Sequence, residues 1–567
     1  MEQGSVQGVP PAPPPSGYAA AQPKRRRTGR VATFAVVLVV LGGLAYAAVR
    51  LFGAVAGTAD VLDDKVPART LFYATAYLDP GAGQKINLEN LARKFPALEG
   101  RDLGQTLQQG LDALSAQGGL SFSRDIQPWL GTQMAVAFEP PTGPEPGFAF
   151  LIDSDNDARA RAGLARAEGS QAFGEGATWK SQPYRGVQVR VGEIAPGVGT
   201  RAYAILDNTV IVSTEADVIH EVIDTMQGRS PNLADQRTYR DTVDDLPDSV
   251  LGLAYLNFPQ AMNLFGTGSA FNLSEPQISN PFAQLRAFQG LGFSLSAQPA
   301  GLELDFAVDL DLSQLTPEQR AALGGGKQPR EVLSSVPRRA FGVLAIGNFK
   351  DAVQGVIGQA RQNPLVGGFI RKLGLDQVVA GLSGDAALEV GPGTTSPVGG
   401  ALLVGTDDPS GMQRFLDRGA RQIVSSSSSG AAVSFRTEQY KGVTIRFASG
   451  GALGEARITP AYAVANGFGV IATSPEEVKA VIDAHGGPNI TTAPIFRDAR
   501  DQVPGDTQLL YVDTQAILQR FAPQLSSSLG GTFTSVVEPN LRPIKALILT
   551  SGQSGDAVVS RLFLLIR

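Results

Sequence analysis

The sequence predicts an α+β protein made of one N-terminal transmembrane helix followed by two tandem, internally duplicated halves with largely antiparallel sheets. Three observations predict this arrangement: an uncharged apolar run near the N-terminus, a motif order that occurs twice, and short strand and helix patterns joined by hairpin signals. Hairpins in place of strict strand–helix alternation favour antiparallel sheets that are covered by helices.

The apolar run extends from Val31 to Val49 and contains no charged residue. Because about 20 apolar residues are needed to cross the core of a bilayer, we expect a transmembrane helix at residues 31–52. Lys24–Arg27 and Arg30 precede the run, and basic flanks favour the cytoplasmic side. We therefore expect a cell-membrane protein with a cytoplasmic N-terminus, and with everything after about residue 53 outside the cytoplasm.

Two alternatives concern this N-terminal region. Residues 1–30 are rich in Pro, Gly and Ala, which is typical of a disordered tail, although the stretch PAPPPSGY could be a polyproline ligand for a cytoplasmic module. The apolar run could be a cleaved signal peptide, because Ala45-Tyr46-Ala47 and Ala54-Val55-Ala56 resemble cleavage sites. The length of the run and of the segment before it favours a retained anchor, with residues 53–66 as a stalk.

Composition limits the chemistry that this chain can perform. A length of 567 residues is too long for one ordinary domain. The chain has no cysteine, which excludes disulfides, thiolate metal sites and a cysteine nucleophile, and its two histidines are His220 and His485. The first 50 residues carry six basic residues and one acidic residue, whereas the whole chain has a net charge of −5, so the remainder is strongly acidic. An acidic exterior argues against nucleic acid as a partner.

The region after the stalk contains the same motifs twice. The repeated stretches are Tyr184-Arg185-Gly186-Val187 with Tyr440-Lys441-Gly442-Val443, Val222-Ile223-Asp224 with Val481-Ile482-Asp483, and Pro231–Pro247 with Pro488–Pro504. Chance does not easily produce this order twice. We therefore expect a first α+β repeat at residues 67–312 and a second at 331–567, joined by a linker at 313–330.

Local patterns place individual elements in these halves. We expect a strand at Leu71–Leu78, a helix at Leu103–Ala116, a long strand at Tyr184–Val191 and a hairpin turn at Asp207-Asn208. The last segment, Val558–Ile566, is rich in β-branched and apolar residues, so we expect the C-terminus to be part of a sheet.

One motif indicates a family. The stretch Asp125-Ile126-Gln127-Pro128-Trp129-Leu130-Gly131, after an N-terminal anchor with a basic flank, resembles the bacterial domain-of-unknown-function family 3352, over most of residues 67–567. The heavy use of Ala, Gly and Arg is similar to that of actinobacterial members. In the second half the signature is degenerate, at Gly381-Leu382-Ser383-Gly384. The resemblance implies a membrane-anchored envelope protein without an established activity, and it supplies no catalytic residues.

Two clusters could carry chemistry but have structural explanations that we favour. Asp153, Asp155 and Asp157 alternate as at the start of a calcium loop, yet the Gly and Glu that such a loop needs are replaced by Ala158 and Leu164. Aspartates between a strand and a helix more often cap the helix.

The second cluster is His220 with Asp224, four residues apart on an expected helix. This spacing could orient an imidazole as a general base. The matching residues in the second half are Lys479 and Asp483, so a cation before an acid recurs while the imidazole does not. We therefore favour a solvated ion pair on the helix surface.

Arg240-Asp241 and Arg497-Asp498 are the candidates for a specific site, because an Arg beside an aromatic residue could bind a carboxylate or phosphate. The structural alternative, which we favour, is that each Arg braces the start of a helix. In that case Arg240→Ala or Arg497→Ala should lower stability by about 0.5–3 kcal/mol. We expect the neighbouring rings of Tyr239 and Phe496 to be buried in equivalent places.

No enzyme signature is present in the sequence. It lacks the G-x-S-x-G elbow, the H-E-x-x-H motif and a P-loop, and it indicates no catalytic, cofactor-binding or metal-binding residues. We expect a non-enzymatic binding or scaffolding module of the cell envelope, whose partners are the membrane and an unidentified envelope protein or ligand. The alternatives are a carrier or sensor of an apolar ligand and a carboxylate-dependent hydrolase.

Overall fold

The structure is a computed structural model that describes residues 60–99, 103–140, 147–195, 199–266, 286–323, 328–347, 349–360, 375–394, 396–426, 434–449, 459–505 and 507–567. The expected cytoplasmic tail, the transmembrane segment Val31–Val49 and most of the stalk lie outside these residues. Within the described ranges, no helix combines the length and the apolar character that a membrane span requires.

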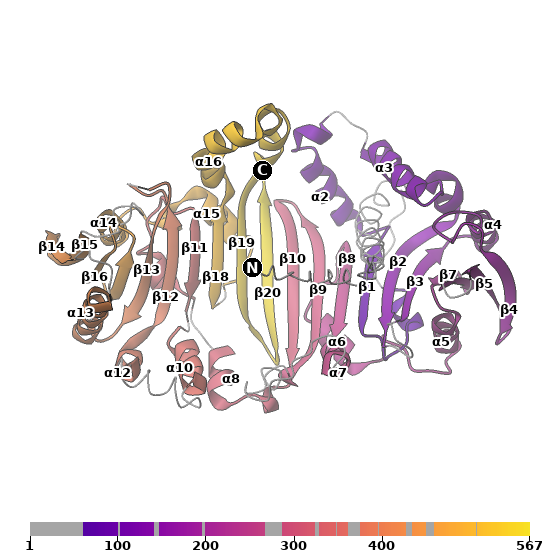
Figure 1. Cartoon of the computed structure of the whole chain (residues 1–567), viewed down its shortest axis with the longest axis horizontal. Helices are drawn as coiled ribbons and strands as arrows, with labels where there is room; N and C mark the ends of the chain where they lie inside the picture. The colour runs from indigo at the N-terminus through magenta and orange to yellow at the C-terminus, as the bar shows by residue number, and fades with distance from the viewer. Residues whose placement is uncertain are drawn as a thin grey trace, which may run out of the picture.

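The described strands form one 20-stranded sheet that extends across the whole molecule (Figure 1). The strands of the first half are β1 (Phe72–Tyr77), β2 (Leu130–Glu139), β3 (Gly147–Ser154), β4 (Thr178–Tyr184), β5 (Val187–Ala195), β6 (Gly199–Leu206), β7 (Thr209–Ser213), β8 (Gly252–Asn257), β9 (Phe288–Gln298) and β10 (Gly301–Leu310). Those of the second half are β11 (Gly342–Ile346), β12 (Leu382–Gly391), β13 (Gly399–Thr406), β14 (Ser434–Tyr440), β15 (Val443–Ser449), β16 (Ala461–Ala465), β17 (Phe468–Ala472), β18 (Gln508–Asp513), β19 (Ile544–Ser554) and β20 (Ala557–Ile566).

The spatial order of the strands is β4-β5-β6-β7-β3-β2-β1-β8-β9-β10-β20-β19-β18-β11-β12-β13-β17-β16-β15-β14, and each pairing is antiparallel. When β1–β10 are matched with β11–β20, this order reads the same from either end. The α+β class with antiparallel pairing is therefore as predicted. The sequence did not indicate that both halves share one sheet.

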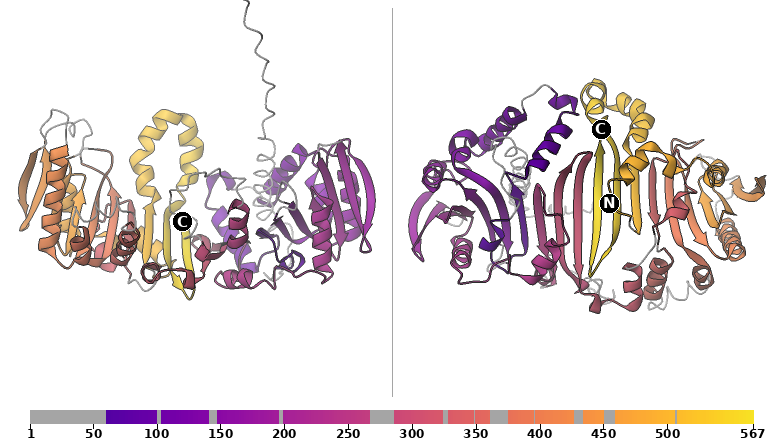
Figure 2. Two further views of the ribbon diagram at one scale, coloured as in Figure 1. Left: turned by 60° about the horizontal axis from the view of Figure 1, so that its bottom comes forward. Right: turned by 180° about the vertical axis from the view of Figure 1, so that it is seen from behind.

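Helices lie against both faces of this sheet. They are α2 (Ala82–Ala92), α3 (Leu103–Gln117), α4 (Asp157–Ala167), α5 (Ala216–Met226), α6 (Arg237–Val243), α7 (Phe258–Gly266), α8 (Pro317–Leu323), α9 (Arg330–Leu333), α10 (Phe349–Ala360), α12 (Leu375–Ala380), α13 (Pro409–Ser426), α14 (Pro475–Ala484), α15 (Pro494–Arg500), α16 (Thr514–Leu529) and α17 (Glu538–Leu541). Figure 2 shows α16 and the helical residues after it as an arch that projects from the sheet.

The alternation of side chains along β2 shows how the two faces are covered, since successive residues of a strand point to opposite faces. Ala135 and Ala137 lie in a core cluster with residues of α5 and α6, whereas Met134 and Val136 lie in a different cluster with residues of α4. In the second half, α14 and α15 contribute to the larger core and α13 contributes to a smaller one on the other face. We call the face with α4 and α13 the outer-helix face.

Two local features differ from the expectations, and a third is as expected. The segment Tyr184–Val191 is not one strand, because β4 ends at Tyr184 and a turn with positive φ at Arg185 and Gly186 leads into β5. The residues expected as a linker contain helix α8, which packs against α10. By contrast, the turn at Asp207-Asn208 has the expected positive φ values, 44° and 59°.

The two halves meet at the pairing of β10 with β20, which places the C-terminal strand at the centre of the sheet (Figure 1). Here Arg561 lies directly opposite Asp305, and its Nε is 2.7 Å from Asp305 Oδ1 and 3.0 Å from Glu303 Oε1. Asp305 is completely buried. An ion pair therefore crosses the seam between the halves.

Candidate functional site

Each half of the protein is hollowed near the turn that leads into a helix, and the two hollows overlap at the helix N-cap and at the third residue after it. In the first half, the hollow has a volume of about 450 Å³ and is lined by Ser123, Gln127, Pro128, Leu130, Asp155, Asn156 and Arg159. In the second half, a pocket of about 270 Å³ is lined by Gln377, Val378, Gly381, Thr406, Asp408, Gly411, Met412, Arg414 and Arg418. We call these the first-half hollow and the second-half pocket.

Strand register shows which residues correspond between the two places. Leu130 pairs with Ser154 in the first half, and Leu382 pairs with Thr406 in the second, each followed by the same shift in register. Gly381 therefore takes the position of Trp129. This corrects the sequence alignment of the degenerate signature, which was displaced by one residue.

In the first half, a buried ion pair is formed by Asp125, which lies between the lining residues Ser123 and Gln127 in the sequence. Asp125 is 2% exposed, and its Oδ1 accepts a hydrogen bond from Arg166 Nε at 2.9 Å. Arg124 Nη2 donates to Oδ2 at 2.9 Å, as does the backbone N–H of Ser121. These contacts, led by the hydrogen bond from Arg124, hold the pKa of the Asp125 carboxyl well below its ordinary value. Asp125 is thus a carboxylate that stays ionised and pairs with both Arg124 and Arg166.

Trp129 fills the space beside this pair. Its ring is 3% exposed, and its Nε1 donates to the backbone carbonyl of Asp125 at 2.6 Å. The helix approaches so closely that a Cβ on Gly163 would lie 2.8 Å from Trp129 Nε1. In the second half the large and the small residue are exchanged. Gly381 takes the position of Trp129, and Phe415, which follows its helix cap by the same number of residues as Gly163, takes the position of that glycine.

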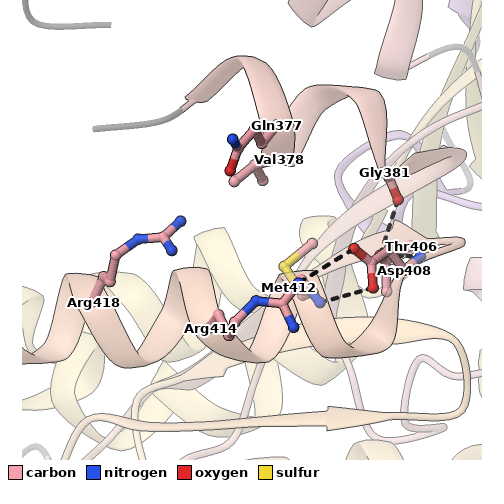
Figure 3. A pocket seen from close by; sticks show the side chains of 9 residues that line it. Gln377, Val378, Gly381, Thr406, Asp408, Met412, Arg414 and Arg418 are labelled. Atoms are coloured by element: carbon pink, nitrogen blue, oxygen red, sulfur yellow. Dashed lines mark hydrogen bonds and ion pairs between the residues drawn. The ribbon is translucent and has the colours of Figure 1, made fainter. Parts of the chain in front are cut away.

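The second-half pocket presents two arginines on one face of α13. Figure 3 shows Gln377 of α12 and Arg418 of α13 facing each other across the pocket. Arg414 Nη2 lies 3.9 Å from Asp408 Oδ2, while Asp408 Oδ1 caps the helix by accepting the backbone N–H of Gly411 at 2.8 Å. Arg418 has no hydrogen bond or ion pair with any other residue in the described ranges. The pocket is therefore weakly basic.

A second surface of interest is a row of aliphatic side chains on the outer-helix face. Residues that pair directly across strands share one face of a sheet. The row runs across nine adjacent strands through Ile471, Leu402, Leu388, Leu344, Leu510, Leu549, Leu562, Leu304 and Leu295. We call this the aliphatic row.

Much of the aliphatic row is open to solvent. Leu388 is 47% exposed, Ile471 45%, Leu344 41%, Leu295 39% and Leu402 37%. The four central residues, from β18, β19, β20 and β10, are half-buried. Large aliphatic side chains that lie exposed side by side indicate a binding surface more strongly than scattered ones do.

The predicted candidate residues Arg240 and Arg497 lie away from both hollows. They are exposed on the short helices α6 and α15, and no described residue forms a hydrogen bond or ion pair with either guanidinium. The neighbouring Asp241 pairs with Arg237, and Asp498 pairs with Arg567. An anion-binding role for Arg240 and Arg497 stays a prediction.

The aromatic residues beside these arginines are buried as expected. Tyr239 and Phe496 are each 3% exposed, and each packs edge to face on a tyrosine, Tyr255 in the first half and Tyr511 in the second. In the first half, Tyr239 Oη also donates to Asp63 Oδ2 at 3.3 Å. Burial of Asp63 raises its pKa to about 7.

The two clusters with structural explanations are arranged differently from the sequence-based expectation. The N-cap of α4 is Asn156, whose side chain accepts the backbone N–H of Arg159, whereas Asp153 Oδ2 accepts from both the N–H and the hydroxyl of Thr132. No group of metal-binding side chains is found among the described residues.

His220 does not form the expected ion pair with Asp224. Its ring stacks on Tyr184, with ring centroids 3.9 Å apart, and Asp224 instead accepts hydrogen bonds from Tyr184 Oη and Arg185 Nε. In the second half, Asp483 accepts from Tyr440 Oη and Lys441 Nζ in the same way. The recurring unit is thus a tyrosine–aspartate contact between a hairpin and a helix.

Buried carboxyl groups lie beneath the opposite face of the sheet. Glu139 accepts a hydrogen bond from Thr70 and lies 3.6 Å from Arg69, and burial raises its pKa to about 7. Glu389 lies near Glu477 and Arg339, and burial raises its pKa to about 8. Both glutamates are 1% exposed, and neither lines a hollow. Sequence reasoning missed them because a glutamate on a strand carries no signal of its burial.

A family model described as "Protein of unknown function (DUF3352)" matches residues 31–390 and 373–550. The chain belongs to this family. No match was found among curated proteins. Solved structures of TP0453 are similar to part of this chain. Crystal form III shares 11% identity, with 47% of this chain and 84% of that chain covered, and a TM-score of 0.24. Crystal form IV shares 11% identity, with 45% and 81% covered, and a TM-score of 0.23.

Proposed function

We propose that this protein is a single-pass, membrane-tethered extracytoplasmic binding module whose sheet binds the acyl chains of a lipid. The aliphatic row is the observation that carries the proposal. Its side chains contain no polar atoms, and the backbone groups beneath them are engaged in pairing with neighbouring strands. Such a surface offers apolar contact without hydrogen bonds, which suits a hydrocarbon chain.

The row is long enough for an acyl chain to lie along part of it. Strands in a sheet are about 4.8 Å apart, so nine strands extend the row over about 40 Å. One leaflet of a bilayer core is about 15 Å thick, so a lipid chain would contact only part of the row. Protein–protein interface cores are instead enriched in aromatic residues and arginine, neither of which is present in the row.

The tether is supported by the apolar run at Val31–Val49 and its basic flank, which would hold the folded part next to a membrane surface. The carboxylate-dependent hydrolase is less well supported, since the buried glutamates of the described sheet lie on the face opposite the row. A scaffolding role remains the second candidate, because an exposed apolar face could instead bind an envelope protein.

We also infer that the two halves arose by internal duplication. The inference is supported by the repeated motifs, by the strand order that reads the same from both ends, and by a matching pair of isolated bridges. These bridges join Pro67 to Asn232 in the first half and Pro337 to Asn489 in the second.

Photolabelling tests the proposed function. The full chain is reconstituted in phosphatidylcholine nanodiscs containing a phospholipid with a diazirine in its acyl chain, irradiated, and mapped by mass spectrometry. We expect labelled peptides from β11, β12 and β13. Leu344→Asp and Leu388→Asp should each reduce this labelling at least tenfold, because a carboxylate against hydrocarbon is costly.

The matched control is Val356→Asp, since Val356 is 67% exposed on α10 and is not part of the row. Equal loss of labelling in Val356→Asp, or no labelling of these strands in the wild-type protein, would contradict acyl binding. If the row mutations instead abolish a protein crosslink formed in cells while lipid labelling is absent, the scaffolding candidate is favoured.

A further inference from the structure

We propose that the second-half pocket binds an oxyanion, a carboxylate or phosphate group, which takes the place of a carboxylate that the first half supplies from its own chain. This site is separate from the aliphatic row. The row residue Leu402 lies four residues along β13 from the pocket residue Thr406, a distance of about 14 Å at 3.4 Å per residue.

The comparison of the two halves carries the argument. The helix caps Asn156 and Asp408 each accept the backbone N–H of the third residue along, so α4 and α13 are in register from this point. Counting from these caps, Arg418 takes the position of Arg166. Counting back from Leu130 and Leu382 in the same way, Gln377 takes the position of Asp125.

The exchange of Asp125 for Gln377 removes a carboxylate from the position that faces the helix arginine. In the first half, Arg166 is neutralised by a carboxylate at 2.9 Å. In the second half, an arginine is kept on the helix while the facing carboxylate is replaced by a neutral amide. Figure 3 shows the Gln377 and Arg418 side chains directed toward each other with open space between them. Among the described residues, the pocket thus keeps the cation of the first-half ion pair, and no carboxylate takes the position of Asp125.

Other groups at the pocket strengthen its attraction for an anion. Arg414 stands one turn before Arg418 on the same face of α13, and its Asp408 partner is 3.9 Å away, beyond hydrogen-bond distance. Lys350 of α10 donates to the backbone carbonyl of Ala380 at 3.2 Å, next to the pocket residue Gly381. The Gln377 amide can donate a hydrogen bond to an oxyanion, which the Asp125 carboxylate cannot do.

The ligand is defined by this chemistry. Two arginines with an amide donor suit a planar carboxylate or a phosphate, which guanidinium groups bind through paired hydrogen bonds. The anion could be a free phosphate ester or the headgroup of an anionic lipid. The volume of about 270 Å³ is at the lower end for small-molecule sites, which suits a headgroup-sized ligand.

The test uses the full chain in phosphatidylcholine nanodiscs and two probes. In one arm, sn-glycerol 3-phosphate is titrated by isothermal calorimetry, and in the other, the nanodiscs contain phosphatidylglycerol and binding is followed by protection of Arg418 from a guanidinium-modifying reagent. Saturable one-to-one binding in the first arm indicates a free anion, and protection in the second indicates a lipid headgroup. Either result supports the site, and failure of both overturns it.

Substitutions of pocket residues test whether glycerol 3-phosphate binds in the second-half pocket. Arg418→Ala should weaken glycerol 3-phosphate at least tenfold, and Gln377→Asp should do the same without removing any arginine, because it restores the internal carboxylate. Arg421→Ala is the matched control, since Arg421 is exposed on the same helix and does not line the pocket. Loss of binding in Arg421→Ala equal to that in Arg418→Ala, or wild-type affinity in Gln377→Asp, would refute the proposal.

The first half offers an independent check. Asp125→Asn combined with Trp129→Gly removes the carboxylate charge and the ring that fills the space beside it, so the stoichiometry of glycerol 3-phosphate binding should rise toward two. A stoichiometry of one in a variant that remains folded by circular dichroism would show that an unpaired arginine here is not sufficient, and would count against the proposal. Acyl photolabelling of the aliphatic row should be unchanged in all these variants, so the two proposals can fail separately.

Discussion

Removing one partner of the ion pair at the seam between the two halves should strongly destabilise the centre of the sheet. Arg561 of β20 bonds to Asp305, which is fully buried and whose Oδ2 has no hydrogen-bond partner among the described residues, and also to Glu303. Replacing Arg561 with Ala leaves these two neighbouring carboxyl groups without their cation. We therefore expect Arg561→Ala to be among the most destabilising single changes in the chain.

The magnitude follows from the burial of the two partners. Breaking a buried ion pair by removing one partner costs about 3–5 kcal/mol, because an uncompensated charge stays inside the protein. The Arg561 side chain is 30% exposed, so water can reach part of the vacated space. We therefore expect a loss near the lower end, about 3 kcal/mol. The apolar pair Asp305→Leu with Arg561→Leu should lie much closer to wild type, since it leaves no unpaired charge at these two positions.

Urea unfolding of the full chain, followed by circular dichroism, measures this effect as a shift of the transition midpoint. The charge-swapped variant, Asp305→Arg with Arg561→Asp, is the sharpest control, because the two positions are direct strand partners. It should recover a large part of the stability that either single change loses. The reasoning would be refuted if the midpoint shift of Arg561→Ala corresponded to a stability loss of less than about 0.5 kcal/mol. It would also be refuted if the charge-swapped variant were no more stable than either single variant.

Two further predictions concern titration and the predicted arginines. Burial raises the pKa of Glu389 from 4.5 to about 8, so the folded protein keeps this proton where the unfolded chain has released it. The contribution of this group to stability should be full below about pH 4.5 and fall between pH 4.5 and 8, by at most about 1.4 kcal/mol per pH unit. Urea midpoints at pH 5 and 8 should therefore differ less in Glu389→Gln, and an unchanged difference would contradict this. Arg240 and Arg497 are exposed, and no described residue forms a hydrogen bond or ion pair with either guanidinium. Replacing either with Ala should therefore change thermal stability by no more than about 0.5 kcal/mol, and a larger loss would favour the bracing role.

The class of the fold was predictable from local patterns, and its extent was not. Hairpin signals such as Asp207-Asn208 and the β-rich end of the chain indicated antiparallel strands. Joining two halves into one sheet depends on the pairing of β10 with β20, strands that are far apart in sequence. No periodicity within either strand specifies such a distant partner, because pairing depends on complementarity across the whole edge.

The second-half pocket was not predictable for a related reason. The positions of Trp129 and Gly163 in one half are occupied by Gly381 and Phe415 in the other, so a large and a small residue have exchanged places between the segment before a strand and a helix. Considered alone, the glycine at position 381 looks like a loss of the family signature that contains Trp129. The role proposed for Gln377 also depends on Arg418, about 40 residues later, and the two side chains face each other only after α12 and α13 have folded together.

The central position of β20 means that the sheet cannot be fully paired until the last strand has been synthesised. Strand β10 ends at Leu310 and its partner β20 begins at Ala557, so about 250 residues separate them. At synthesis rates of about 5–20 residues per second, the edge of β10 waits about 12–50 s for its partner.

During that interval the first half presents an unpaired strand edge that a second copy of the chain could occupy, as in domain swapping. A chain that ends ten residues early would lose β20 and leave the edges of both β10 and β19 open. Premature termination near the C-terminus should therefore yield cross-paired aggregates, and a bulky fusion at Arg567 would sit beside the strand that closes the sheet last.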